Sequence, residues 1–361
     1  MGRRLCLILI LLVLPAGQSW AQTTLRDSGP VAATRDGQVI ENLRITSTRG
    51  DGITVNGRDD VVIRNVEILH AGGAGIWVQD ADRLLIENVS ITHTGAPPFG
   101  ENPNSDRNNI HVYRSSNLTV RRAKLVRGST GIYLDRSPDA KISMVEGHDF
   151  RGLFPRGQLV QFGEGSHRGL IEDFSVECPR ETSFTEDNIN VFHSSDIVVR
   201  RGLIDGNNSH SGVGVIAEQA KGYTSGLLVE DVDAVRMGNG CFSASPGFDV
   251  TFRRTRCKSN ICEAQNRRMA DGSIDTVRGG RPLSNALGWA AGMNSQNVRI
   301  LDSVYADWCN YNLVWPRSNF ETVELREQDF TLRSPIRLTF PWEPGHTGEP
   351  TERPRPPILL P

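Results

Sequence analysis

The stretch that decides the fold is residues 39–95, which read VIENLRITSTRGDGITVNGRDD, then VVIRNVEILHAGGAGIWVQDADR, then LLIENVSITHTG. Asn42, Asn65 and Asn88 recur in it at intervals of 23 residues. Apolar and polar residues alternate in short segments, which predicts β-strands with one buried face, and the Gly, Asn and Asp residues between them are typical of tight turns. A unit this short cannot bury its own apolar side, so each unit must stack on the next.

Similar units continue along the chain, for example LTVRRAKLVRGSTGIYLDRSPD at 118–139 and VRILDSVYAD at 298–307. The repeat predicts an all-β protein: one solenoid of about eleven coils of parallel strands, with Ile, Val and Leu stacked inside at about 4.8 Å per coil. A leucine-rich repeat has a similar period but needs a Leu and Asn consensus that is absent here, and a propeller blade needs about 40 residues.

The repeated pattern V-x-I-x-N-V-x-I…G-I-x-V resembles the right-handed parallel β-helix repeat proteins of the pectin-lyase-like superfamily, over about residues 35–340. The resemblance implies a right-handed parallel β-helix. The superfamily contains polysaccharide lyases, glycoside hydrolases, uronan epimerases, phage-type depolymerases and noncatalytic members, so this fold does not fix the function. The motifs of the named catalytic subfamilies, such as those of polygalacturonases and alginate epimerases, are not found in the sequence.

The two ends of the chain differ from the repeat. A basic pair at 3–4, an apolar run at 5–14 and a small-x-small site at 19–21 predict a signal peptide over 1–21, and hence a secreted or periplasmic protein. A membrane anchor is the alternative, but the run is shorter than the ~20 residues that a span needs. We expect the β-helix domain over 22–340 and a proline-rich tail over 341–361, either disordered or lying along the surface.

Charge and cysteines limit the partners. The chain has 40 Lys and Arg against 42 Asp and Glu, a net charge of −2, which argues against a nucleic-acid partner. Five cysteines follow the predicted signal peptide, so at least one thiol stays free, and Cys257 with Cys262 is the first expected disulfide. No cysteine spacing is typical of a zinc site. The sequence predicts no metal and no cofactor, with calcium left open, and it does not determine the oligomeric state.

One outward column is expected to carry the chemistry. The segments NNIHVYRSSNLTVRR at 108–122 and DNINVFHSSDIVVRR at 187–201 align and fix the register of the coils between them. Because Ile and Val alternate inward, the residues between them point outward in the order Thr54, Trp77, His111, Tyr133, Gln161, Asn190. Rings at successive coils are suited to stacking on sugars. The alternative is an ordinary aromatic or Asn stack that stabilises the solenoid.

Long insertions at 95–107, 150–157, 177–185, 205–211 and 263–288 mark the expected binding side. The candidate catalytic residues are Asp187, His111, His193, Glu218 and Arg107. The candidate substrate-binding residues are Trp77, Tyr133, Asn109, Asn188, Asn190, Asn208 and His210. Asp135, Glu164, His193 and Glu218 are expected one per successive coil at the edge of the same sheet.

These residue types permit two reactions. Carboxylates one or two coils apart would fall in the roughly 5–10 Å range used in glycoside hydrolysis. A His or Arg base beside a charge-neutralising group would suit β-elimination from a uronic acid. The sequence therefore predicts a secreted carbohydrate-active protein that cleaves or modifies an acidic or complex polysaccharide, as a lyase or a hydrolase. A noncatalytic polysaccharide-binding or assembly protein is the alternative, and a structural surface protein is a third reading. For each single acid, the plain alternative is a solvated turn residue.

Overall fold

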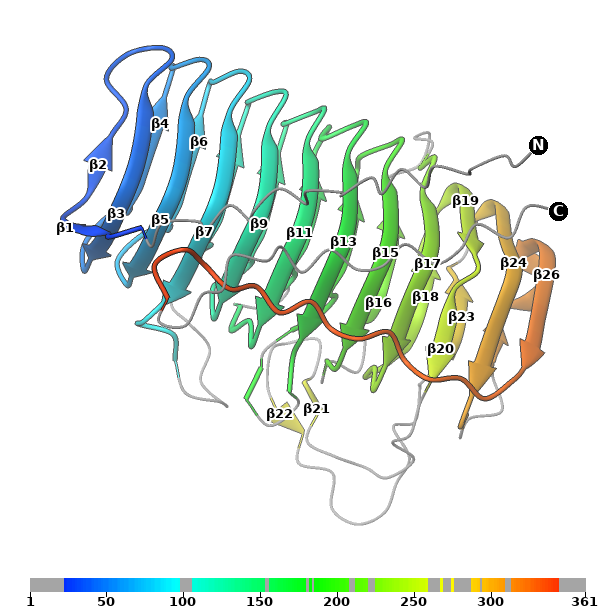
Figure 1. The fold of residues 1–361 in the computed structure, drawn as a ribbon. Coiled ribbons are helices and arrows are strands. Elements are labelled where there is room, and N and C mark those ends of the chain that lie inside the picture. Colours follow the sequence, from blue (N-terminus) through cyan, green and yellow to red (C-terminus); the bar gives the residue numbers. More distant parts are fainter. Residues whose placement is uncertain are drawn as a thin grey trace, which may run out of the picture.

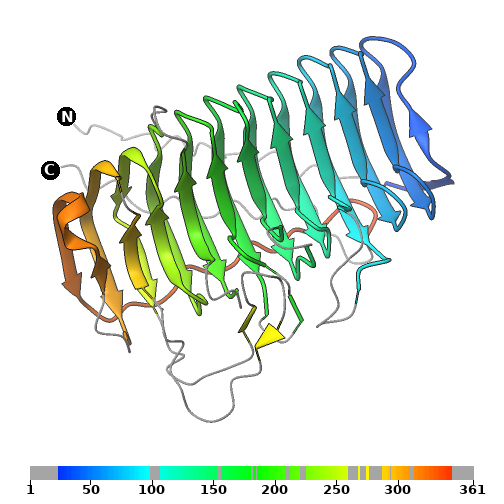
Figure 2. The ribbon, with the colours of Figure 1, turned by 180° about the vertical axis from the view of Figure 1, so that it is seen from behind.

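The computed structural model describes residues 23–97, 106–152, 156–179, 182–183, 185–207, 212–219, 225–258, 267–268, 274–275, 287–292, 294–308 and 313–343. Its strands stack coil upon coil into an elongated solenoid (Figures 1 and 2). Two parallel sheets run the length of this solenoid, one of 11 strands and one of 13. The all-β parallel β-helix predicted from the repeat is therefore confirmed, and the 11-stranded sheet matches the expected number of coils.

We call the 11-stranded sheet the short-strand sheet. Its strands follow one another in the order of the chain: β2 (Val31–Ala32), β4 (Ile53–Asn56), β6 (Ile76–Gln79), β8 (Ile110–Tyr113), β10 (Ile132–Asp135), β12 (Val160–Gly163), β14 (Ile189–Phe192), β16 (Val213–Glu218), β18 (Gly240–Ala244), β23 (Leu287–Ala291) and β25 (Val314–Trp315).

We call the 13-stranded sheet the long-strand sheet. It contains β1 (Arg26–Ser28), β3 (Val39–Ser47), β5 (Val62–His70), β7 (Leu85–His93), β9 (Thr119–Val126), β11 (Lys141–His148), β13 (Leu170–Glu177), β15 (Val198–Asp205), β17 (Leu228–Val235), β19 (Phe248–Arg253), β20 (Arg256–Lys258), β24 (Gln296–Ala306) and β26 (Phe320–Glu327). A 3-10 turn, η1 (Arg317–Asn319), precedes β26, and β21 (Arg267–Arg268) pairs with β22 (Ile274–Asp275).

The recurrent asparagines of the repeat have a clear role in the long strands. Asn42, Asn65 and Asn88 have positive φ angles of 57°, 52° and 51°, a region that Asn tolerates better than most residues. Their side chains form a ladder, with Asn65 Nδ2 donating to Asn42 Oδ1 at 3.2 Å and Asn88 Nδ2 donating to Asn65 Oδ1 at 3.3 Å. The ladder links successive coils at the point where each strand turns.

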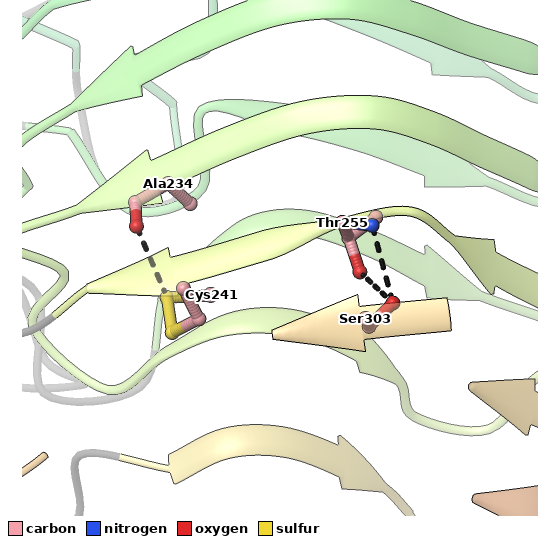
Figure 3. Close-up of a disulfide and its surroundings, with 5 residues drawn as sticks. Ala234, Cys241, Thr255 and Ser303 are labelled. Atoms are coloured by element: carbon pink, nitrogen blue, oxygen red, sulfur yellow. Dashed lines mark hydrogen bonds between the residues drawn. A yellow bond between two sulfur atoms is a disulfide. The ribbon is translucent and has the colours of Figure 1, made fainter. Parts of the chain in front are cut away.

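The core is a continuous stack of Ile, Val, Leu and Phe between the two sheets, most of them fully buried. Near its C-terminal end, a disulfide joins Cys241 of β18 to Cys257 of β20, 16 residues apart (Figure 3). The expected pairing of Cys257 with Cys262 is therefore wrong, because the stacked coils place Cys241 beside Cys257. Cys178 is a buried free thiol, while Cys262 and Cys309 lie outside the described residues.

An extended segment, residues 328–343, follows the last strand, and we call it the strap. In Figure 1 it crosses in front of the long-strand sheet from β26 back toward β7. Its backbone bonds the sheet: the Leu338 N–H donates to Glu146 Oε2 at 2.7 Å, and the Ile336 N–H donates to Ser175 Oγ at 3.0 Å. The last strand, β26, ends at Glu327, and the strap follows it.

Residues 1–22 and 344–361 lie outside the described residues, so the expected signal peptide and most of the expected tail stay predictions. In the part of the chain that the structure describes, no helix is long and apolar enough to cross a membrane.

Candidate functional site

The predicted outward column lies on the short-strand sheet. The strand register pairs Thr54 with Trp77, Trp77 with His111, His111 with Tyr133, Tyr133 with Gln161, and Gln161 with Asn190. The order derived from alternation is thus confirmed for all six residues. On either side of each of them, the Ile, Val, Leu and Phe residues of the same strands are fully buried. We call this row the polar column.

The aromatic members of the polar column contact one another. The Trp77 and His111 ring centroids are 4.3 Å apart, and those of His111 and Tyr133 are 4.9 Å apart in an edge-on arrangement. All three side chains are half-buried, so each keeps some surface for a ligand. Aromatic rings of this kind serve equally to stabilise neighbouring coils and to bind the faces of sugars.

Arg156 stands beside this row, and the residue-by-residue reading of the sequence missed it. Its guanidinium lies 4.4 Å from the Tyr133 ring centroid and donates to Gln161 Oε1 at 2.8 Å. It also forms an ion pair with Asp106, with Nε to Oδ2 at 3.3 Å. Both residues come from predicted insertions, 150–157 and 95–107. Both insertions were expected on the binding side, and this expectation is the signal that could have identified Arg156.

His111 is a neutral member of the column. Burial lowers its pKa to about 4, with Asp106 raising the value and Arg156 lowering it further. Its Nδ1 lies 3.1 Å from Asn108 Nδ2, so an amide hydrogen of Asn108 bonds this nitrogen and the imidazole proton belongs on Nε2. His111 is therefore uncharged at neutral pH and serves as a hydrogen-bonding group rather than a cation.

Arg107 does not join His111 as predicted. Its guanidinium donates to the Asp106 carbonyl at 3.0 Å, and its charge acts on the buried imidazoles of His70 and His93. Those two rings stack 4.9 Å apart at the corner that precedes the short strands. Arg107 therefore belongs to this corner.

The second aligned segment places two acids around one amide. Asn190 Nδ2 donates to Asp187 Oδ2 at 2.9 Å and to Glu218 Oε2 at 2.7 Å. Because both oxygens bond the same nitrogen at 2.9 and 2.7 Å, they are at most 5.6 Å apart. Asp187 is only 2% exposed, and its Oδ1 accepts the Val213 N–H at 2.8 Å, whereas Glu218 is more exposed.

Both carboxyl groups of this pair hold their protons more tightly than usual. Burial raises the pKa of Asp187 well above its ordinary value, and the neighbouring Glu186 and Glu218 raise it further. Burial also raises the pKa of Glu218, against the opposing effects of Asn190 and His193. Two carboxyls this close titrate as a pair and share a proton. This is the arrangement from which a general acid is built.

The edge residues lie near their expected places. The register aligns Asp135 with Gly163, Gly163 with Phe192, and Phe192 with Glu218, so Glu164 and His193 each fall one residue later than Asp135 and Glu218. His193 Nδ1 lies 3.1 Å from Glu164 Oε1. Burial raises the pKa of Asp135, and the negative charge of Glu164 adds to that effect while Arg136 opposes it.

Two predicted substrate-binding residues point into the protein. Asn109 is fully buried, and its amide nitrogen lies 3.2 Å from His70 Nε2 and 3.3 Å from the Ile91 carbonyl oxygen. Asn188 is also fully buried and donates to the Gly206 carbonyl at 3.1 Å. Both precede a short strand at a corner, where strict alternation no longer sets the side-chain direction. Asn208 and His210 lie outside the described residues.

Several oxygen atoms around the polar column have no hydrogen-bond partner among the described residues. They are Asp106 Oδ1, Asn108 Oδ1, Asp135 Oδ1 and Asn190 Oδ1, all inaccessible to solvent. Buried polar atoms are nearly always paired, and a cluster of exceptions is typical of a functional site. Within the described ranges, no group of three or more His, Cys, Asp or Glu residues is placed to hold a metal ion, and the question of calcium stays open.

Comparisons with known proteins agree with the architecture. A family described as "Right handed beta helix region" matches residues 30–154. No curated protein matches the sequence.

Three similar solved structures share the fold at low sequence identity. The catalytic domain of Agl-KA has a TM-score of 0.54 at 14% identity, over 83% of this chain and 54% of that one. A tailspike double mutant of E. coli bacteriophage HK620, in complex with pentasaccharide, has 0.51 at 10% identity, over 86% and 58%. The GH136 lacto-N-biosidase from Eubacterium ramulus has 0.50 at 12% identity, over 83% and 62%. The chain therefore spans little more than half the length of these proteins, and the likeness shows a right-handed parallel β-helix.

Proposed function

We propose that the protein binds a polysaccharide along the polar column and hydrolyses it at Glu218. The observation that carries this proposal is the Asp187–Asn190–Glu218 arrangement, in which one amide nitrogen bonds two carboxyl groups of raised pKa. Such a pair keeps a proton to a higher pH than an isolated carboxyl does, and the departing oxygen of a glycoside needs such a proton.

Glu218 is the proton donor in this mechanism, because it is the more exposed member of the pair. Asp187 is a positioning residue, which shares the proton and holds Asn190. Glu164 follows β12, two coils from Glu218, or about 10 Å at the usual coil spacing. That separation is close to the roughly 6.5–9.5 Å that leaves room for a water in inverting hydrolases.

The step balances as an inverting hydrolysis. The Glu218 carboxyl donates its proton to the leaving oxygen as the bond between the anomeric carbon and that oxygen breaks. Glu164, held by His193, accepts a proton from the water whose oxygen bonds the anomeric carbon. Net transfer of a proton back through solvent restores both groups.

The half-exposed rings of Trp77, His111 and Tyr133 offer surfaces for further sugar units along the same face. The fold neighbours support a carbohydrate ligand, since the tailspike is in complex with pentasaccharide and another is a lacto-N-biosidase. A lyase is less well supported, because β-elimination needs a cation beside the uronate carboxylate and Arg156 is engaged by Asp106.

The test is product analysis on neutral and uronic polysaccharides. We expect new reducing ends without the ultraviolet absorbance of an unsaturated product. Glu218→Gln should lower kcat by about 10²–10⁴-fold with KM little changed. Glu41→Gln, the same change on the long-strand sheet, is the matched control and should keep full activity. Full activity of Glu218→Gln, or an unsaturated product, would contradict the hydrolase.

A noncatalytic binder is the second candidate, favoured by the mutual contact of the column rings. The variant Trp77→Ala distinguishes sugar binding by these rings from stabilisation of neighbouring coils. If they bind sugars, the variant should lose polysaccharide retention in affinity electrophoresis with a Tm within a few degrees of the parent. A large fall in Tm with intact retention would assign Trp77 to coil stacking. Retention by the parent protein without any product would favour the binder.

The proposed location is outside the cytoplasm. The Cys241–Cys257 disulfide supports it, because disulfides persist in oxidising compartments. Fractionation of cells that express the full chain, beside a chain lacking residues 1–21, tests the predicted signal: only the full chain should appear in the periplasm or medium. Equal distribution of both chains would contradict it.

A further inference from the structure

Three successive members of the polar column each hold a hydrogen-bond donor that the chain does not use. The strand register places His111, Tyr133 and Gln161 on adjacent coils, and we call them the donor set. The proton of neutral His111 belongs on Nε2, Tyr133 has a hydroxyl hydrogen, and the amide nitrogen of Gln161 has two hydrogens. Among the described residues, no partner accepts any of these hydrogens.

The acceptor atoms of the same side chains are already engaged. His111 Nδ1 accepts from Asn108 at 3.1 Å. The guanidinium of Arg156 donates to Gln161 Oε1 at 2.8 Å and to the Tyr133 hydroxyl oxygen at 3.3 Å. Because a guanidinium only donates, it fixes the orientation of the Gln161 amide and turns the nitrogen away from itself. His111 and Gln161 therefore offer a ligand hydrogens and no acceptor.

The donors are protonated and within reach of a ligand. Burial raises the pKa of Tyr133, against the opposing charge of Arg156, so the phenol keeps its hydrogen at neutral pH. The side chains of His111 and Tyr133 are half-buried. His111 Nε2 and Gln161 Nε2 are not among the unpartnered atoms that are closed to solvent in the described part of the chain.

Arg156 is itself held from two sides. Its Nε lies 3.3 Å from Asp106 Oδ2, and its carbonyl oxygen accepts the Glu186 N–H at 3.2 Å. These contacts join the insertions 95–107 and 150–157 to each other and to the segment before β14. The carboxylate of Asp106 offsets the charge of Arg156, so this ion pair orients the donor set without adding a net charge to it.

We infer that the donor set binds an acyl oxygen of the glycan, which is the carbonyl oxygen of an N-acetyl group or a carboxylate oxygen of a uronic acid. Arg156 is the positioning residue that keeps Tyr133 and Gln161 oriented for this bond. Adjacent coils are about 4.8 Å apart, so donors from two of them can meet at one oxygen through bonds of about 2.9 Å. This inference rests on the proposed function, because it names the feature of the glycan that the same face recognises.

An acyl oxygen suits these donors better than a sugar hydroxyl does. A carbonyl or carboxylate oxygen accepts two hydrogen bonds and has no hydrogen of its own to satisfy. A hydroxyl that accepts from His111 and Gln161 must still place its own hydrogen, and neither side chain has an acceptor left for it. An unpaired polar group of this kind lowers affinity. The donor set should therefore distinguish an acyl-bearing sugar from the same sugar with a hydroxyl in that place.

Ligands matched in backbone test the inference on the full chain. Chito-oligosaccharides are compared with cello-oligosaccharides, in which a hydroxyl replaces the N-acetyl group, by titration calorimetry at low temperature. Polygalacturonate and alginate are each compared with the carboxyl-reduced polymer by affinity electrophoresis.

In at least one of these comparisons, the acyl-bearing ligand should bind about tenfold tighter or more. A preference in the first comparison assigns the N-acetyl group, and a preference in the second assigns the carboxylate. Equal binding throughout overturns the inference. Failure of every ligand to bind overturns it together with the proposed function.

A single hydroxyl provides the second test. Tyr133→Phe should weaken binding of the preferred ligand about fivefold and leave binding of its acyl-free partner within twofold. Tyr113→Phe is the matched control, because Tyr113 lies at the edge of β8 and its hydroxyl accepts from Arg136 at 3.0 Å. The control should change neither affinity. Equal losses in the two variants, or an unchanged preference in Tyr133→Phe, overturn the inference.

The positioning role of Arg156 is tested in the same way. Arg156→Gln frees the Gln161 amide to turn, so the preference for the acyl-bearing ligand should fall about fivefold. Arg136→Gln removes the corresponding guanidinium from Tyr113 and should keep the full preference. An unchanged preference in Arg156→Gln, or an equal loss of affinity for both ligands of a pair, overturns the positioning role.

The two proposals fail separately. A preference for the acyl-bearing ligand without new reducing ends contradicts the hydrolase and keeps the inference. New reducing ends from ligands that bind equally with and without the acyl oxygen contradict the inference and keep the hydrolase.

Discussion

Buried polar groups differ between the part of the long-strand sheet that the strap covers and the polar column. On the long-strand sheet, Glu146, Ser175 and Asp233 are at most 1% exposed, and each bonds the strap. Along the polar column, Asn190 of β14 and Asn108, which precedes β8, are buried nearly as deeply, yet each keeps an acceptor without a partner among the described residues. Satisfied groups stabilise a fold, whereas unsatisfied ones cost stability and are kept where a ligand completes them.

The strap contact at Asp233 shows which hydrogen-bond donors a buried carboxylate requires. Asp233 is fully buried, and its two oxygens accept from Arg256 at 2.6 and 2.5 Å and from the Arg333 N–H at 2.7 Å. Without these donors, the charge would be unpaired away from water, which costs several kcal/mol. The strap therefore belongs to the fold as much as the coils do.

The largest expected effect is at this acid. Asp233→Ala should lower the free energy of unfolding by about 3–5 kcal/mol, because it leaves the guanidinium of Arg256 and the Arg333 N–H without their acceptor. Denaturant unfolding followed by circular dichroism measures the loss. The control is Asp329→Ala, an exposed strap acid paired with Lys258, which should cost far less because water screens this pair. Equal losses would remove the distinction between a buried strap contact and an exposed one.

A smaller effect is expected where the strap bonds a hydroxyl. Ser175 Oγ accepts the Ile336 N–H at 3.0 Å and donates to the Ile336 carbonyl at 3.2 Å. Ser175→Ala should cost about 1–3 kcal/mol in the same assay, because both strap groups become unpaired. Ser90 stands three coils away in the same column and has no hydrogen bond to the described strap residues. Ser90→Ala should change stability by less than about 0.5 kcal/mol, and a loss as large as that of Ser175→Ala would contradict this account.

The polar column should respond with the opposite sign. Glu218→Gln removes a carboxyl whose pKa is raised chiefly by burial, so its charge is a cost of the folded state near neutral pH. We expect the variant to be as stable as the parent at pH 8 or more stable, by up to about 1 kcal/mol, while activity falls. A loss of stability as large as that of Asp233→Ala would show that the acid pair serves the fold.

The polar column could be predicted from the sequence. The polar column followed from alternation and from the alignment of 108–122 with 187–201, because parallel stacking repeats each position at the next coil. Asn109 and Asn188 were misplaced, because a corner turns the side chain inward and alternation carries no information about corners.

Other contacts could not be predicted from the repeat pattern. Arg156 lies in an insertion, where no register applies. The strap crosses coils whose residues are far away in sequence, 100 positions for Asp233 and Arg333 and 192 for Glu146 and Leu338. Proline-rich composition does not indicate which surface such a segment covers. Cys241 pairs with Cys257 rather than Cys257 with the nearer Cys262, because the turn of the chain through β18, β19 and β20 brings Cys257 back beside the start of β18.

The smallest expected effect is a difference in pH dependence between the two faces. Burial alone would raise the pKa of Glu146, but hydrogen bonds from His148 and the Leu338 N–H hold it below the ordinary value of 4.5. Its contribution to stability is therefore present above pH 4.5 and lost as the pH falls through its lower folded pKa. Glu218 has the opposite pH dependence, because its pKa is raised in the folded protein. Its contribution to stability is present below pH 4.5 and is lost as the pH rises through its folded pKa.

Unfolding free energies of the parent, Glu146→Gln and Glu218→Gln between pH 3 and pH 8 test this reversal. As the pH falls, the advantage of the parent over Glu146→Gln should shrink, because the carboxylate that accepts the strap N–H becomes protonated. Over the same range, the parent should gain on Glu218→Gln, because protonation relieves the crowded acids. Each unit of pKa displacement corresponds to about 1.4 kcal/mol, so the slopes are measurable. If the stability differences for Glu146→Gln and Glu218→Gln changed with pH in the same direction, both acids would contribute to folding in the same way. The contrast between the strap contacts and the polar column would then be wrong.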